Sequence, residues 1–189
     1  MMKNDLSSGS LWNKAGKAGL VLGAATIAFT FVGGMCAGIS GFGGKLLSTL
    51  VTLAKLAACI WLLHRFLLKL KSDFPDAGYK ALHGYGMRTT LCSSLLVAAY
   101  ALVPFLIDGN ETARLARSSA EEAFSQFGMA LDANTQAAMD ATLNNLPVIS
   151  FFSMFLYCLL WGWVLTSVFS RQICPPDPFA GPDGDNLPN

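Results

Sequence analysis

Lys55 is the residue whose type and position most clearly invite chemistry. It lies in the middle of the apolar stretch TLVTLAKLAACIWLLHR, residues 49–65. A charge at the centre of a membrane span costs about 2.5–3.5 kcal/mol on insertion scales, so the surroundings must compensate for it. Ser48, Thr52 and Cys59 share the helical face of Lys55, at spacings of three and four residues. We therefore expect an inward-facing polar site within the membrane.

Three roles fit an amine at this position. Lys55 could donate hydrogen bonds to backbone carbonyls or to hydroxyls, with Tyr100 and Tyr157 as candidates at similar depth. It could line a water-filled cavity and bind an anionic ligand or a lipid headgroup. It could also pair with an acidic residue of a partner subunit, because no Asp or Glu occurs inside the apolar stretches of this chain. The sequence leaves all three open.

No residue set typical of catalysis or metal binding accompanies Lys55. The sequence has no HExxH or GxSxG motif and no pair of aspartates within an apolar stretch. GISGFGGK at 38–45 lacks a preceding strand and the Ser or Thr that follows the lysine of a phosphate-binding loop. The five cysteines form no CxxC pair, and four lie in apolar stretches, where thiols usually act as small hydrophobes. We expect no enzymatic activity, no catalytic residue, no metal and no cofactor.

The composition is typical of a membrane protein. Of 189 residues, 53% are hydrophobic and 13% are charged, whereas soluble domains carry about 25% charged residues. A helix needs roughly 20 apolar residues to cross a bilayer. The stretches that meet this need are 17–39, 46–68, 89–107 and 147–169. They predict an all-α fold, an integral membrane four-helix bundle whose first span is too long for the apolar part of a signal peptide.

The lysines and arginines that flank the spans indicate the direction of threading. Nine lie in the N-terminal segment, the second connection and the C-terminal flank, with Lys17 and Arg65 counted at the ends of their spans, against three in the other two connections. Because positive residues concentrate on the cytoplasmic side, both termini are predicted to be cytoplasmic. Residues 1–171 then form the membrane domain, and 172–189, rich in Pro, Gly and Asp, form a disordered cytoplasmic tail.

The outer connection, residues 108–146, is the one sizeable soluble segment. An apolar stripe at helical spacing predicts an amphipathic helix that begins near Glu111. Asp132 or Asn134 could cap a second helix that runs through Leu143. These helices either cover the end of the bundle or offer a docking surface to a partner.

The inner connection, residues 71–90, mixes aromatic and basic side chains, as membrane interfaces do. Pro75 suits the first position of a helix. The segment forms either an interfacial ramp into the third span or a site for an anionic lipid headgroup, with Lys80 and Arg88 as contacts. His83 has no carboxylate set nearby, so we do not expect it to act as a general base.

Small residues predict where the spans pack, because lipid is as apolar as leucine and close backbone approach favours association. The first span carries two GxxxG motifs, Gly19–Gly23 and Gly34–Gly38. The fourth has small or polar residues at every fourth position, Gly162 among them. We expect these glycines at helix contacts, and a homodimer through GxxxG is also open.

The layout resembles a family of small four-span membrane proteins of Bacteroidota, known as domain of unknown function four-one-nine-nine. The likeness covers about Gly16 to Arg171 and also includes the acidic outer loop. Its other features are HRFLLKLKSDFPDAGYKALHGYG (64–86), LLVAAYALVPFLI (95–107) and LLWGWVLTSVFSR (159–171). The resemblance implies a bacterial inner-membrane protein, but it assigns no catalytic residues and does not account for Lys55.

These features predict a non-enzymatic inner-membrane scaffold or an accessory subunit of a larger membrane complex. The alternative is a small transporter or channel component in which Lys55 contacts an anionic ligand or lipid. The expected partners are the lipid bilayer and either another membrane protein or a second copy of the chain. No nucleic acid is expected.

Overall fold

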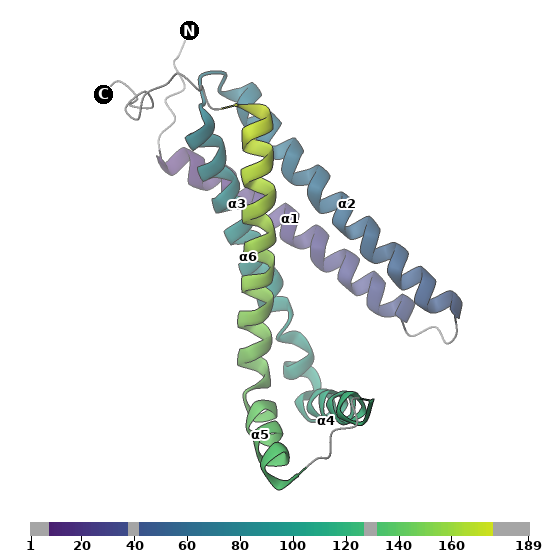
Figure 1. Ribbon diagram of the computed structural model, residues 1–189. Helices are drawn as coiled ribbons and strands as arrows, with labels where there is room; N and C mark the ends of the chain where they lie inside the picture. The colour runs from purple at the N-terminus through teal and green to yellow at the C-terminus, as the bar shows by residue number, and fades with distance from the viewer. Residues whose placement is uncertain (1–7, 38–41, 127–131, 176–189) are drawn as a thin grey trace. The chain divides into compact units, whose positions relative to one another are not determined.

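The computed structural model describes residues 8–37, 42–126 and 132–175. Over these residues the fold is all-helical, as predicted, with six helices and no strands (Figure 1). The helices are α1 (Ser8–Ala37), α2 (Phe42–Asp73), α3 (Tyr79–Tyr100), α4 (Val103–Gln126), α5 (Ala133–Asn144) and α6 (Leu146–Ile173). They group into two compact units, one formed by the chain up to Val97 and from Tyr157 onward, the other by Ala98–Leu156.

Three segments are long and apolar enough to cross a membrane by themselves: Gly9–Cys36, Leu46–Asp73 and Leu146–Ile173. Helices α3 and α4 meet the same test only together, as one broken span. The described part of the chain therefore holds three or four membrane-capable helices. The predicted tail, 172–189, lies largely outside the described residues, and α6 itself continues to Ile173.

The predicted third span, 89–107, is interrupted where the sequence analysis expected a continuous helix. Helix α3 ends at Tyr100, residues 101–102 form a turn, and α4 begins at Val103. Pro104 explains the break, because a proline ring clashes with the carbonyl four residues earlier, which here belongs to Tyr100. In the first turn of α4 its missing N–H is no loss, since no intrahelical acceptor is available there.

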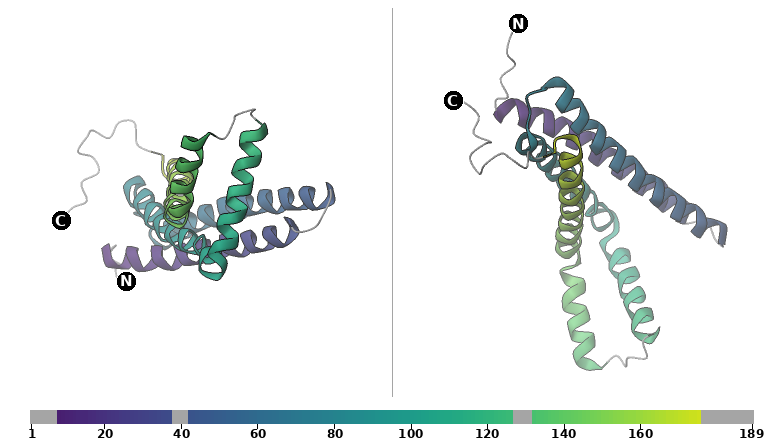
Figure 2. Two further views of the ribbon diagram at one scale, coloured as in Figure 1. Left: turned by 90° about the horizontal axis from the view of Figure 1, so that it is seen from below. Right: turned by 45° about the horizontal axis from the view of Figure 1, so that its top comes forward.

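In the first unit, α1 and α2 form an antiparallel hairpin and lie side by side in all three views (Figures 1 and 2). Small residues bring the two helices close. The hydroxyl of Thr26 lies 3.3 Å from the thiol of Cys59. Nearer the other end, a Cβ placed on Gly33 would lie 3.5 Å from a methyl carbon of Val51. The hairpin seam is therefore continuous along both helices.

The core of the first unit lies where α1 begins, α2 ends and α3 begins. Its buried members are Ala15, Ala18, Leu63, Leu67, Leu70, Phe74, Ala77, Leu82 and Tyr85. Lys14 closes this end, since its ammonium lies 2.9 Å from a carboxylate oxygen of Asp73 and 4.4 Å from the ring centroid of Phe74. The start of α1 thus contacts the end of α2 through an ion pair and a cation–π contact.

The connection between α2 and α3 is a turn, and the helix start suggested at Pro75 is wrong. Helix α2 continues to Asp73, and α3 begins only at Tyr79. Lys71 Nζ donates hydrogen bonds to the carbonyl oxygens of Pro75, at 2.7 Å, and Ala77, at 2.9 Å. A side chain from α2 therefore satisfies the acceptors that the turn leaves without helical partners.

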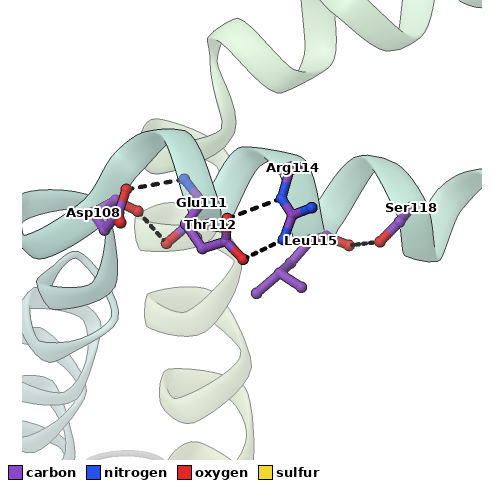
Figure 3. Close-up of polar contacts among 6 residues, drawn as sticks. All are labelled: Asp108, Glu111, Thr112, Arg114, Leu115 and Ser118. Carbon is purple, nitrogen blue, oxygen red and sulfur yellow. Dashed lines mark hydrogen bonds and ion pairs between the residues drawn. The ribbon is translucent and has the colours of Figure 1, made fainter.

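In the second unit, α4 bends at Asp108, whose φ of −149° and ψ of 82° are not helical. Oδ1 of Asp108 accepts the N–H of Glu111 at 3.0 Å, and its carbonyl oxygen accepts the Thr112 hydroxyl at 2.8 Å (Figure 3). Arg114 adds two hydrogen bonds to Glu111, at 2.9 and 2.7 Å. Asp108 therefore caps a new helical segment, which confirms the predicted start near Glu111.

Of the two capping residues that the sequence suggested, Asp132 and Asn134, the structure has Asp132 as the cap of α5. Its Oδ1 accepts the N–H of Thr135 at 2.8 Å. Hydrogen bonding by the side chain of Thr135, and then by this N–H, favours the carboxylate and holds the pKa of Asp132 below its ordinary value. Arg117 joins α4 to α5 through an ion pair with Asp140 at 3.1 Å and also pairs with Glu121, at 3.1 Å, on its own helix.

Candidate functional site

Lys55 lies in the seam between α2 and α1. Its neighbours on the same helical stripe, Val51 and Cys59, both face α1, where they meet Gly33 and Thr26 respectively. Lys55 stands midway between them and is partly buried. The helix geometry therefore places Lys55 on the face of α2 that packs against α1, in the apolar part of the hairpin.

The described residues supply no hydrogen bond and no ion pair to Lys55. Its polar neighbours satisfy one another instead, because the Thr52 hydroxyl donates to the carbonyl oxygen of Ser48 at 2.9 Å. The Thr26 hydroxyl donates its one proton to the carbonyl four residues earlier, at 2.8 Å. The Cys59 thiol must then be the donor in its contact with Thr26. Thr52 is exposed and Ser48 only partly buried, so this polar stripe does not point inward as a whole, as was expected, and the described residues give the Lys55 ammonium no partner.

A second thiol, on α6, lies near the same site. Cys158 is within electrostatic range of both Lys55 and Cys59. A neutral thiol is a weak hydrogen-bond acceptor and no counter-ion. Tyr157, a candidate acceptor, makes no hydrogen bond to Lys55 and is 57% exposed. Since the Cys59 thiol already donates to Thr26, the Lys55 ammonium is the group at this site that can bind an anion or a carboxylate.

Two of the predicted packing glycines bring α1 against α3. A Cβ on Gly19 would lie 2.6 Å from the carbonyl oxygen of Thr89 and from Cβ of Cys92. A Cβ on Gly23 would lie 2.8 Å from a methyl carbon of Leu96. Ordinary carbon contacts are about 3.5–4.0 Å, so both positions accept only a hydrogen atom.

Helices α3 and α6 interlock through a reciprocal pair of glycines. The side chain of Thr90 occupies the space over Gly162, where a Cβ would lie 2.5 Å from Thr90 Cγ2. The side chain of Thr166 occupies the space over Gly86 in the same way. Gly162 was expected at a helix contact. Gly86 was missed, because residues 71–90 were interpreted as a connection outside the spans.

Gly34, from the second GxxxG motif of α1, meets no neighbouring helix among the described residues. Nothing described lies within 4 Å of a Cβ on Gly34, whereas its neighbour Gly33 faces Val51 of α2. Successive residues of a helix point about 100° apart, so only one of two adjacent glycines can face the same neighbour. Gly38 lies outside the described residues.

The two predicted headgroup contacts have different surroundings. The guanidinium of Arg88 lies over the ring of Trp12, 5.3 Å from its centroid, and is partly buried between α3 and α1. Lys80, two turns earlier on α3, is exposed. The structure thus gives Arg88 a packing contact and keeps Lys80 on the surface.

Comparison with known proteins identifies no relative of this chain. No family model matches it, and no curated protein and no solved structure matches it either. The resemblance to a four-span family stays a hypothesis, and the site is interpreted from its own geometry.

Proposed function

We propose that this chain is a non-enzymatic accessory subunit of a larger membrane complex, built as a four-helix bundle in a bacterial inner membrane. One observation supports this most. Lys55 is partly buried in the middle of an apolar helix, and its ammonium finds no hydrogen-bond acceptor and no carboxylate among the described residues. A carboxylate on a neighbouring subunit would offset the cost of this cation, as paired charges within membranes do.

One flank of the Lys55 site is open to such a neighbour. Thr52 lies on this flank and is exposed, with the partly buried Ser48 one turn away. Small side chains spaced four apart let a second helix approach closely within lipid. The opposite face of α2 is different, because Leu53 there is 57% exposed and suits lipid. The proposed partner is therefore a membrane helix that carries Asp or Glu near its midpoint.

The charge distribution supports the proposed threading with both termini in the cytoplasm. Nine lysines and arginines lie on the termini and the second connection, against three on the other side. The part of α4 that follows the bend at Asp108, together with α5, would then lie outside the membrane.

Photocrosslinking within the native membrane tests this proposal. A photoreactive residue at Thr52 should capture one protein that has an acidic residue in an apolar span. Lys55→Met should abolish that crosslink, because the partner helix would lose its counter-charge. The matched probe at Leu53, about 160° around the helix from Lys55, should capture lipid only.

Two results would contradict the proposal. One is a crosslink from Thr52 that persists in Lys55→Met or appears equally from Leu53. The other is labelling of Lys55→Cys by a water-soluble thiol reagent, in a chain whose native cysteines are replaced, to the extent seen for exposed Lys69→Cys. Such labelling would show a water-filled path and favour the transporter alternative.

A further inference from the structure

An open groove of about 460 Å³ lies between the start of α3 and the end of α6. Tyr79 and His83 line it from α3, and Trp163, Ser167 and Arg171 are among the residues that line it from α6. Its volume falls in the range of roughly 300–1,000 Å³ typical of small-ligand sites. All of its walls belong to the first unit.

The polar wall of the groove is held in place by its own hydrogen bonds. The Ser167 hydroxyl donates its single proton to the carbonyl oxygen of Trp163, at 2.8 Å. In its 3.2 Å contact with His83, the serine oxygen must therefore accept, so Nε2 of His83 carries the hydrogen. The ring of Tyr79 stacks on the imidazole, with centroids 5.7 Å apart. These two contacts hold the imidazole in place, with Nε2 directed at the serine oxygen.

Arg171 supplies a free positive charge at this end of the groove. It is exposed in the last turn of α6, and no hydrogen bond, ion pair or ring contact links it to the described residues. No carboxylate is among the side chains that line the groove in the described part of the chain. A guanidinium binds phosphate through two parallel hydrogen bonds, so an anionic phosphate is the ligand chemistry that fits.

The other wall of the groove is apolar. Val164 and Val168 are 44% and 45% exposed, and both lie within the apolar run 147–169. Arg171 lies just beyond the end of that run. The groove therefore crosses from apolar to polar surroundings, which is where the headgroup of a lipid meets its acyl chains. A free phosphate ion would make no favourable contact with the apolar wall formed by Val164 and Val168.

We propose that this groove binds an anionic glycerophospholipid, with Arg171 on the phosphate and an acyl chain along Val164 and Val168. The imidazole of His83, held by Ser167, completes the polar wall. This site is separate from Lys55 and does not depend on a partner subunit.

Native mass spectrometry of the delipidated full chain in detergent tests the proposal. The probes are phosphatidylglycerol, phosphatidylcholine and soluble glycerol 1-phosphate, and only the first should bind tightly. Arg171→Gln should weaken phosphatidylglycerol binding about tenfold, because a charge-assisted bidentate contact is lost. The matched control is Arg65→Gln, which removes a cation stacked 5.1 Å from the Trp61 ring on α2. It should change binding less than about twofold, since exposed charges outside the site act only weakly.

A second variant covers the case in which Arg171→Gln fails to fold. Val168→Asp changes an exposed side chain and should repel phosphatidylglycerol through its negative charge while the fold is kept. Equal losses in Arg171→Gln and Arg65→Gln would overturn the proposal, because they would indicate general electrostatics. Affinity for phosphatidylcholine equal to that for phosphatidylglycerol would overturn it too, because phosphatidylcholine has no net negative charge. Equal affinity for glycerol 1-phosphate would also overturn it, because that probe has no acyl chain.

Discussion

Replacing Gly19 by alanine tests the contact between α1 and α3, and Gly16 on the same helix provides a matched control. A Cβ at Gly19 would lie 2.6 Å from the Thr89 carbonyl oxygen, whereas nothing described lies within 4 Å of a Cβ at Gly16. Comfortable contacts need about 3.5–4.0 Å, so α1 would have to move away from α3 by roughly 1 Å. The carbonyl belongs to the backbone of α3 and cannot rotate aside.

The expected size of the effect follows from two opposing terms. Overpacking a well-filled contact costs about 1–3 kcal/mol. Exchanging glycine for alanine within a helix returns about 0.5–1 kcal/mol where space is open. Gly19→Ala should therefore lower the free energy of unfolding by about 0–2.5 kcal/mol, while Gly16→Ala should raise it by about 0.5–1 kcal/mol. Gly23→Ala should fall between them, because its closest neighbour, 2.8 Å away, is the movable side chain of Leu96.

The assay is reversible unfolding of the purified chain in mild detergent, titrated with a denaturing detergent and followed by circular dichroism. All three alanine variants change the same residue type on one helix, so their helix propensities match. If Gly19→Ala proves as stable as Gly16→Ala, the close approach of α1 and α3 and the packing argument built on it are refuted.

Three further predictions concern the turn and the outer helices. Lys71→Met should lower the free energy of unfolding by about 1 kcal/mol, because two carbonyls of the α2–α3 turn lose their donor; an unchanged value in the detergent titration would contradict this. Arg117→Gln should cost less than about 1 kcal/mol, since its ion pair with Asp140 is exposed, and a larger loss would refute that reasoning. The cap lowers the pKa of Asp132, so its support of α5 is present at neutral pH and lost as pH falls through the folded-state pKa. An NMR titration should give Asp132 a pKa below that of unstructured aspartate, and an equal or higher value would rule out the cap. Asp132→Ala should speed the hydrogen exchange of the backbone amides of 133–144.

Features that depend on a few neighbouring residues could be predicted from the sequence. The long apolar runs predicted membrane-capable helices. Asp132, one of the two suggested caps, predicted the start of α5, because a capping carboxylate acts within one turn. Pro104 is visible in the sequence, but the continuous hydropathy of residues 89–107 was given more weight, so the break after Tyr100 was not predicted. Its steric effect on the carbonyl four residues earlier is as local as a cap and could have been included.

Features that depend on the pairing of distant helices could not be predicted in this way. Gly86 gains its role only because Thr166 of α6 lies over it. The groove needs His83 and Arg171, which the packing of α3 on α6 brings together. Hydrophobic periodicity shows which face of a helix is apolar, but not which helix covers it. The polar stripe around Lys55 could be predicted, because its members lie on a single helix and their spacing in the sequence is enough to place them together.

The central claim is that Lys55 pairs with a carboxylate of another subunit. Native mass spectrometry of the wild-type chain, gently extracted from its own membrane, tests this most directly beside Lys55→Met and the exposed-cation control Lys69→Met. We expect a second protein at fixed stoichiometry with the wild type and with Lys69→Met, and the loss of that protein in Lys55→Met. Two results would contradict the pairing of Lys55 with a partner carboxylate. One is a wild-type chain that is extracted with no second protein bound, and the other is a partner that stays bound to Lys55→Met.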